Sequence, residues 1–308
     1  MYGRNYEGSE QLRVILIYRK KKEDSRRESE IMNYRIYTDT VKSYMPGHKV
    51  NEDRCLFTEF SFMQDDKKVR LMIICDGMGG LNDGEVAAQN GVTGFAEVFY
   101  REIMSCYLET DMDGFSLEYS IHDVEDAMIK ALQCANDKVC AGADSLKATG
   151  ATLSAVCVFD DFAVVINVGD SPVYFYRAAK KKIKLVSVLQ TKAEQDVAEG
   201  IYERYSEEYY ENDHRIYSSL GLYGELNPEN ICVTSIGKLE QGDIFLMGSD
   251  GAFGRMKEEE IQTMIEYCAT GNDGFVLTQL FSRRERISMM IRLHFCISVQ
   301  RKPKRIKW

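Results

Sequence analysis

Three aspartates of this chain each stand at the end of an apolar run and beside a glycine or a serine. Asp76 follows "VRLMIIC" and opens a loop with four glycines, Asp170 follows "VVINVG", and Asp250 follows "DIFLMGS". An acidic pair, Glu52 and Asp53, stands just ahead of the apolar run "CLFTEFSF". Carboxylates at strand ends, beside small residues that let the backbone come close, can collect oxygen ligands around a hard cation. The pattern therefore predicts a divalent-metal site.

The glycine-rich loop after Asp76 also admits two other interpretations. A dinucleotide-binding GxGxxG motif would need glycine where the chain has Asn82, and the sequence lacks the Gly-Lys-Ser/Thr ending of a P-loop. The carboxylate of Asp76 would moreover face the bound phosphates. Asp-Gly and Gly-Asp pairs are also common in plain tight turns. Each motif alone fits such a turn, whereas the acidic positions together favour the metal site.

The elements that must position these carboxylates are mixed α and β, because period-two apolar runs alternate with long amphipathic stretches from Tyr34 onward. Residues 55–62 and 69–75 flank the polar turn "MQDDKK" and are predicted to form a hairpin. Helical spacing predicts one helix from Asp83 to about Tyr107 and a second from about Leu117 to Val139.

The stretch from Ala151 to Arg177 predicts three strands in succession. Tight turns are expected at Asp160-Asp161 and at Gly169-Asp170-Ser171. Strands joined by such short turns are antiparallel, because a parallel crossover needs a dozen or more residues. This pattern argues against a doubly wound nucleotide-binding fold.

The remaining segments have simpler interpretations. Residues from about Gln190 to Ser219 are polar and rich in tyrosine, and they are predicted to form an irregular surface flap. Residues 243–248 predict a strand and residues 256–269 a helix. Residues 1–31 contain a mixed charge run and are predicted to form an amino-terminal extension or linker, and residues 299–308 a basic tail.

Composition excludes several classes of function. The formal net charge of −9, from 39 Lys and Arg against 48 Asp and Glu, argues against a protein whose main task is binding nucleic acid or an anionic membrane. Nine cysteines form no CxxC pair, so neither a disulfide framework nor a zinc ribbon is predicted. No apolar run approaches the roughly 20 residues of a membrane helix, and the amino terminus lacks the apolar core of a signal peptide. We expect a cytoplasmic monomer with no nucleic-acid or membrane partner.

The ordered set of short motifs resembles the metal-dependent PP2C (PPM) family of protein phosphatases. These motifs are "NED" at 51–53, "DGMGG" at 76–80, "GATL" at 150–153, "VGDS" at 168–171 and "SDGAF" at 249–253. Met78, where animal members have histidine, resembles the bacterial branch. The resemblance covers about residues 32–298 and implies an α+β fold, a four-layer α-β-β-α sandwich of two antiparallel sheets flanked by helices.

The resemblance implies a role for each matching residue. Asp76 would bridge two Mn²⁺ or Mg²⁺ ions, the carbonyl of Gly77 would bind one of them, and Asp250 the other. Glu52 and Asp53 would bind metal directly or through water, and Asp170 would share a third, weaker ion with Asp250. The catalytic set would be Asp76, Asp53, Glu52 and Asp250.

Three features depart from the family pattern. The arginine that usually binds the substrate phosphate is absent, so His48 or Lys49 would take its place. The usual Asp-Asn pair before the last strand is replaced by Glu285 and Arg286, so Glu285 would be the metal ligand there. The flap lacks the Asp-His-Ser signature of many relatives, so the sequence does not indicate the specificity.

The implied function is hydrolysis of phosphoserine and phosphothreonine in proteins by a metal-bridged water nucleophile. Two ions about 4 Å apart lower the pKa of that water and hold the phosphate for in-line attack. The substrate would be a phosphoprotein made by a bacterial-type Ser/Thr kinase. Because His48, Lys49 and Glu285 are atypical of the family, the alternative is a catalytically impaired domain that acts as a phosphoprotein-binding or regulatory module. A nucleotide-binding enzyme is a third interpretation.

Overall fold

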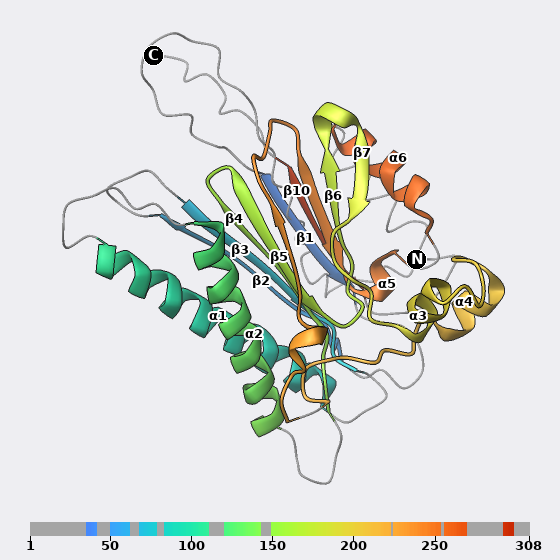
Figure 1. Cartoon of the computed structure of the whole chain (residues 1–308), viewed down its shortest axis with the longest axis horizontal. Helices are drawn as coiled ribbons and strands as arrows, with labels where there is room; N and C mark the ends of the chain where they lie inside the picture. Colours follow the sequence, from blue (N-terminus) through green and yellow to red (C-terminus); the bar gives the residue numbers. More distant parts are fainter. Residues whose placement is uncertain are drawn as a thin grey trace, which may run out of the picture.

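Two five-stranded antiparallel sheets form the centre of the fold (Figure 1). The first sheet has the order β2 (Arg54–Ser61), β3 (Lys68–Cys75), β4 (Leu153–Phe159), β5 (Phe162–Val168) and β8 (Cys232–Ile236). The second sheet has the order β1 (Arg35–Val41), β10 (Arg292–Ser298), β9 (Ile244–Gly248), β6 (Val173–Arg177) and β7 (Lys182–Leu185).

Helices cover the outer faces of both sheets in this computed structural model. It describes residues 35–41, 50–61, 68–78, 83–110, 120–142, 149–222, 224–253, 256–269 and 292–298. The first sheet is covered by α1 (Gly84–Thr110) and α2 (Ile121–Gly142), and the second by α5 (Asp250–Phe253) and α6 (Glu258–Ala269) (Figure 1). The remaining elements are α3 (Lys192–Ala198), α4 (Glu207–Asn212) and the short 3₁₀ helices η2 (Ala178–Lys180) and η3 (Pro228–Asn230). The predicted four-layer sandwich is confirmed.

Side-chain alternation along the strands produces three apolar layers. In β3, Leu71 and Ile73 pack in the layer against α1 and α2, whereas Met72 and Ile74 pack in the layer between the sheets. Such alternation is a property of any pleated strand, since successive side chains point to opposite faces. Strands β4 and β5 are buried on both faces, which explains their nearly continuous apolar sequences.

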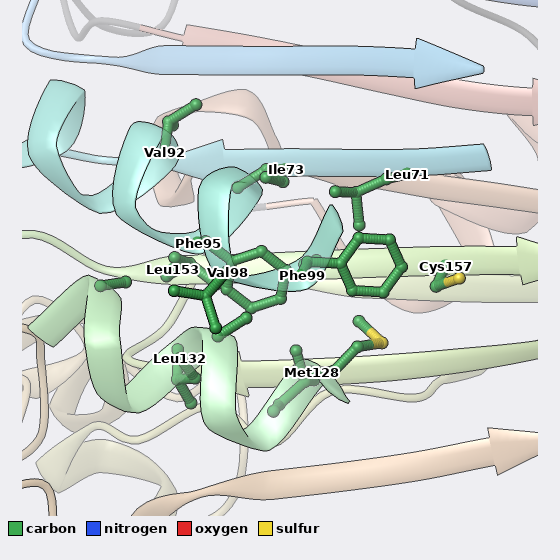
Figure 2. Packing of buried hydrophobic residues seen from close by; sticks show 14 of the residues in the cluster. Leu71, Ile73, Val92, Phe95, Val98, Phe99, Met128, Leu132, Leu153 and Cys157 are labelled. Atoms are coloured by element: carbon green, nitrogen blue, oxygen red, sulfur yellow. The ribbon is translucent and has the colours of Figure 1, made fainter. Parts of the chain in front are cut away.

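The layer between the first sheet and its two helices contains the largest buried side chains. Phe95 and Phe99 of α1 stack with ring centroids 6.3 Å apart, over Leu71 of β3 and beside Met128 of α2 (Figure 2). Phe95 is fully buried. This layer fixes the helices on the first sheet and stabilises the strands whose ends carry the acidic residues.

Several predicted elements are confirmed. Strands β2 and β3 pair as an antiparallel hairpin, and β4 and β5 pair across the turn at Asp160-Asp161. The first predicted helix is α1, and the predicted strand and helix near the carboxyl end are β9 and α6. The second helix begins at Ile121 rather than at about Leu117. Ser120 caps it: the Ser120 hydroxyl accepts from the Asp123 N–H at 3.2 Å, and Asp123 Oδ2 accepts from the Ser120 N–H at 2.8 Å.

The predicted hairpin turn at Gly169-Asp170-Ser171 is wrong. Strand β5 belongs to the first sheet, whereas β6 pairs with β7 and β9 in the second. The chain passes between the sheets here because Gly169 has a φ of +94° and Pro172 has no N–H to continue a ladder. We call residues 169–172 the crossover. Strands β7 and β8 were not predicted.

The flap, residues 190–219, is more regular than predicted. It contains α3 and α4, whose starts are fixed by Thr191 and Ser206, because each side chain accepts a hydrogen bond from an N–H of the first turn. Arg204, in the segment that connects the two helices, forms an ion pair with Glu194 of α3 at 2.6 Å. The expectation of an irregular segment is therefore corrected.

Other predictions concern the chain as a whole. The six cysteines whose side chains the structure describes are all free. Across the described ranges, every helix is too short or too polar to span a bilayer. The predicted extension at residues 1–31 and tail at 299–308 lie outside the described residues, and the domain limits stay predictions.

We expect Phe95→Ala to lower the free energy of unfolding by about 3–5 kcal/mol, because it leaves a cavity in a fully buried layer. Val86→Ala, at an exposed position of the same helix, should change it by less than about 0.5 kcal/mol. Urea denaturation followed by circular dichroism measures both variants. Equal midpoints for the two would contradict the assigned packing.

Candidate metal centre

Strand register brings the predicted acidic residues of the first sheet to one end of that sheet. Arg54 pairs with Cys75, so Asp53 and Asp76 leave the β2–β3 ladder side by side. Leu153 pairs with Val168, so the start of β4 and the crossover lie at the same end. The motifs far apart in the sequence therefore converge because the strands are antiparallel.

The second sheet contributes Asp250 at this same end. Strands β6 and β9 pair through Val173 and Met247, and the Gly248 N–H donates to the Pro172 carbonyl at 3.2 Å. Asp250 follows two residues later, as the first residue of α5. The Ser249 hydroxyl donates to Asp53 Oδ2 at 3.3 Å, which joins the two sheets directly.

The layer between the sheets is apolar along the strands and becomes polar at this end. Asp76 continues the row of Met72 and Ile74, which faces this layer, and Asp53 continues the row of Cys55 and Phe57. The buried polar residues here are Asp53, Thr152, Ser154, Asn167, Asp170, Ser171 and Ser249. Glu52, Asp76 and Asp250 are partly exposed, so the polar end is open to solvent.

Thr152 fixes the backbone of Asp76 on both sides. The Thr152 hydroxyl accepts from the Asp76 N–H at 3.2 Å, and the Thr152 N–H donates to the Asp76 carbonyl at 2.9 Å. The same hydroxyl lies 2.6 Å from the Ser171 hydroxyl, and the Ser154 hydroxyl donates to the Ser171 carbonyl at 2.6 Å. These bonds hold the Asp76 loop and the crossover in fixed relation to each other.

Burial and the charges of neighbouring carboxyls raise the pKa values of three residues at this end, Asp53, Asp170 and Asp76. Burial raises the pKa of Asp53 to about 7, and the charges of Asp250 and Glu52 add to the effect. Burial and the charge of Asp250 raise the pKa of Asp170 to about 8. Burial also raises the pKa of Asp76 well above its ordinary value, with contributions from Asp53, Asp250 and Asp170. A cation at this position would relieve the repulsion among these groups.

The donor set suits a hard divalent cation in chemistry and charge. Asp53 Oδ1 is buried and has no hydrogen-bond partner among the residues that the structure describes, although a buried carboxylate oxygen normally has one. All the side-chain atoms available to bind a metal here are carboxylate oxygens, and oxygen is the ligand that Mg²⁺ and Mn²⁺ prefer. Within the described ranges, no three His, Cys, Asp or Glu side chains are already grouped closely enough to hold one ion. Ion binding would therefore draw the carboxylates toward one another.

Gly77 lies where two backbone segments pass very close. A Cβ atom added to Gly77 would lie 2.2 Å from the Gly84 carbonyl oxygen and 2.9 Å from the Glu52 carbonyl oxygen. The Gly77 N–H also donates to that Glu52 carbonyl at 3.3 Å. The close approach of the start of α1 and the Glu52 turn explains why glycine follows Asp76.

The structure places five of the predicted ligands and the Gly77 backbone at the same end of the two sheets. His48, Lys49 and Glu285 lie outside the described residues. Sequence reasoning missed Thr152, although it belongs to the "GATL" motif. It also missed Arg54, whose Nη1 donates to the Asn51 and Asp53 carbonyls at 2.7 and 2.8 Å and so fixes the acidic turn.

Comparison with known proteins agrees with this architecture. The family model of protein phosphatase 2C matches residues 46–280. Protein phosphatase PhpP from Streptococcus pneumoniae is 23% identical over 219 residues, which cover 63% of this chain and 72% of PhpP. The S. agalactiae serine/threonine phosphatase structure has a TM-score of 0.64 at 20% identity, over 87% of this chain and 100% of that one. The catalytic domain of the serine/threonine phosphatase PstP in complex with two manganese ions has a TM-score of 0.60 at 19% identity. The match covers 88% of this chain and 100% of the PstP chain.

The chain belongs to the protein phosphatase 2C family, because the family model matches well over half of its length. The predicted family, its bacterial-type branch and the predicted enzyme class, a protein serine/threonine phosphatase, are confirmed. The family is metal-dependent, in agreement with the carboxylates at one end of the two sheets. We call this end, which carries Glu52, Asp53, Asp76, Asp170 and Asp250, the acidic end.

We expect metal-free protein to lose stability as the pH rises from about 5 to about 8. Asp170 has a higher pKa when folded than its ordinary value of 3.8, so between these values the folded state binds more protons than the unfolded state. Folding is then favoured at the lower pH, and this contribution disappears as pH passes the folded pKa. Urea midpoints in a chelator should fall less with pH for Asp170→Asn than for the wild type. Equal declines in both would contradict the raised pKa, and Asp126→Asn on the exposed face of α2 is the control.

Gly77→Ala should lower the free energy of unfolding by about 1–3 kcal/mol, because the added methyl group meets backbone that cannot move independently. Gly237→Ala is the matched control, since no described residue lies within 4 Å of its added Cβ. Chemical denaturation of both variants measures the difference. A Gly77→Ala midpoint equal to that of Gly237→Ala would show that the close approach is misplaced.

Proposed function

We propose that this phosphatase hydrolyses phosphoserine and phosphothreonine in proteins at the acidic end of its two sheets, with two Mn²⁺ or Mg²⁺ ions. The observation that carries the proposal is the position of Asp76, whose pKa is raised by burial and by Asp53, Asp250 and Asp170 together. A carboxylate that interacts with partners on both sheets is suited to bridge two ions. The buried Asp53 Oδ1, which has no hydrogen-bond partner in the described part of the chain, supports the same site.

Each carboxylate has a proposed role that the resemblance to the protein phosphatase 2C family implies and that its position supports. Asp76 would bridge the two ions, with the carbonyl of Gly77 on one of them. Asp250, from the second sheet, would bind the other ion, while Glu52 and Asp53 bind directly or through water. Asp170, on the crossover, would hold a third and weaker ion together with Asp250; burial and then the Asp250 charge raise the pKa of Asp170.

The chemistry divides between the cations and the chain. When bound, the two ions supply an activated water and neutralise charge on the phosphoryl oxygens. The residues of the chain bind and space the ions, and the partly exposed Glu52, Asp76 and Asp250 leave that end open to a phosphoprotein side chain. Thr152 holds Asp76 through two backbone hydrogen bonds, so the proposed bridging carboxylate needs little rearrangement of its backbone.

The remaining site residues stay proposals. His48 or Lys49 would bind the substrate phosphate, and Glu285 would complete the metal site from the segment before β10. The substrate would be a phosphoprotein made by a bacterial-type Ser/Thr kinase, and the enzyme would act as a cytoplasmic monomer. Each of these rests on the sequence alone.

Asp76→Asn should lower Mn²⁺-dependent phosphate release from a phosphothreonine peptide by about 100-fold or more, because the central charge that balances the ions is lost. Asp126→Asn makes the same chemical change at an exposed position of α2 and should retain wild-type activity. Phosphate release is measured with and without Mn²⁺. A wild-type rate no higher than that of Asp76→Asn would exclude the active enzyme.

Glu285 is tested in the same assay. Glu285→Ala should raise the Mn²⁺ concentration needed for half-maximal activity if this residue is a metal ligand. An unchanged Mn²⁺ dependence would remove Glu285 from the site without affecting the roles proposed for Asp76 and Asp250.

A further inference from the structure

We propose that Gln190 is a positioning residue that holds Asp170 in place and links it to the flap. The inference rests on the cation-binding role proposed for Asp170. Gln190 lies at the first position of the flap, between β7 and α3, and it is buried, with 1% of its surface exposed. It contacts the crossover at Gly169, the residue directly before Asp170.

Gln190 engages both backbone polar groups of Gly169. Its side-chain Oε1 accepts from the Gly169 N–H at 2.7 Å, and its own N–H donates to the Gly169 carbonyl at 3.1 Å. Gly169 adopts a φ of +94°, and an added Cβ would lie 2.7 Å from the Thr152 side chain. Neither strand ladder reaches this peptide, so Gln190 supplies the hydrogen bonds that a sheet would otherwise provide.

The other end of the Gln190 amide is also fixed. Nε2 donates to the Asn230 carbonyl at 2.7 Å, at the end of η3. Because the Gly169 N–H needs an acceptor and the Asn230 carbonyl needs a donor, the orientation of the amide follows from its two partners. The side chain thus spans from the crossover to the segment before β8, and both of these segments are anchored in the first sheet.

A second amide supports the same junction from the end of β5. Asn167 Oδ1 accepts from the Val188 N–H at 3.0 Å, and Asn167 Nδ2 donates to the Val188 carbonyl at 2.8 Å. Asn167 and Gln190 therefore hold the chain on both sides of Leu189 against the start of the crossover. Two buried amides within one short junction leave the backbone before Asp170 with little freedom.

Gln190 also belongs to the base of the flap. Its carbonyl accepts from the Tyr217 N–H at 3.0 Å, and the Lys192 N–H donates to the Arg215 carbonyl at 2.8 Å, so the two ends of the flap are paired here. Asp213 lies just before this pairing, at the end of α4, and its charge contributes to the raised pKa of Asp170. The hydrogen bonds of Gln190 therefore connect the base of the flap, at Tyr217, to Gly169, the residue before Asp170.

A double-mutant cycle with Mn²⁺ as the probe tests the proposal. Mn²⁺ binding is measured by isothermal titration calorimetry on the whole chain, which requires no turnover. Asp170→Asn and Gln190→Ala should each weaken the Asp170-dependent site, the latter by about 10-fold, since residues that orient a metal ligand typically contribute 10–100-fold. The double variant should bind Mn²⁺ no more weakly than Asp170→Asn alone, because Gln190 acts through Asp170.

Two further variants separate positioning from general instability. Gln190→Glu keeps an acceptor for the Gly169 N–H but loses the donor to the Asn230 carbonyl, and it should weaken Mn²⁺ binding less than Gln190→Ala. Gln195→Ala, at an exposed glutamine of α3, should bind Mn²⁺ as the wild type does. Metal-free thermal unfolding confirms that each variant is folded, and if Gln190→Ala is not, Gln190→Glu replaces it in the cycle.

The proposal is overturned if the effects of Gln190→Ala and Asp170→Asn simply add, or if either single variant binds Mn²⁺ with wild-type affinity. These outcomes are separate from failure of the proposed function. A wild type that binds Mn²⁺ but releases no phosphate would contradict the function, whereas the cycle would still report whether Gln190 positions Asp170.

Discussion

Repulsion among carboxylates from both sheets is the constraint on which the rest of this structure depends. Asp53 and Asp76 come from the first sheet, Asp250 from the second, and Asp170 from the crossover between them. Burial, together with the charges of neighbouring carboxylates, raises the pKa values of Asp53, Asp76 and Asp170, an arrangement that is unfavourable for folding at neutral pH. The three apolar layers of the sandwich must supply the stability that offsets it. A bound cation would turn the same repulsion into binding energy, which is why a metal-dependent activity suits this acidic end.

The scaffold meets this constraint with uncharged hydrogen bonds at the ends of the strands. Thr152 holds the backbone of Asp76, Ser249 reaches Asp53 across the two sheets, and Gln190 holds the peptide before Asp170. Neutral hydroxyl and amide groups can fix these backbones without adding another buried charge. Thr152 and Gln190 bind backbone groups rather than carboxylates, and Ser249 contacts only Oδ2 of Asp53, so Asp53 Oδ1 stays available to a cation.

The sequence predicted much of the fold and the acidic residues at the strand ends, because both follow local rules. An aspartate that ends an apolar strand can be recognised without knowing which strand lies beside it, and the antiparallel register then brings Asp53 and Asp76 together. The crossover could not be recognised in this way. Gly169-Asp170-Ser171 has the composition of a hairpin turn, and only the pairing of β6 with β9 shows that the chain changes sheets.

The missed elements had weak or unused signals. Helix α3 is too short to show periodicity, although Thr191 and Glu194 have the spacing of a capping box. The role of Gln190 depends on contacts with residues 21 and 40 positions away, so no local pattern could reveal it. His48, Lys49 and Glu285 remain sequence predictions, because they lie outside the described residues.

X-ray diffraction at the manganese absorption edge, from crystals of this protein grown with Mn²⁺, tests the central claim most directly. The account predicts two anomalous peaks about 4 Å apart between the sheets, with the Asp76 carboxylate in contact with both ions. A third, weaker peak is expected beside Asp170. Absence of manganese at this end of the sheets, or two ions bound without Asp76, would contradict the account.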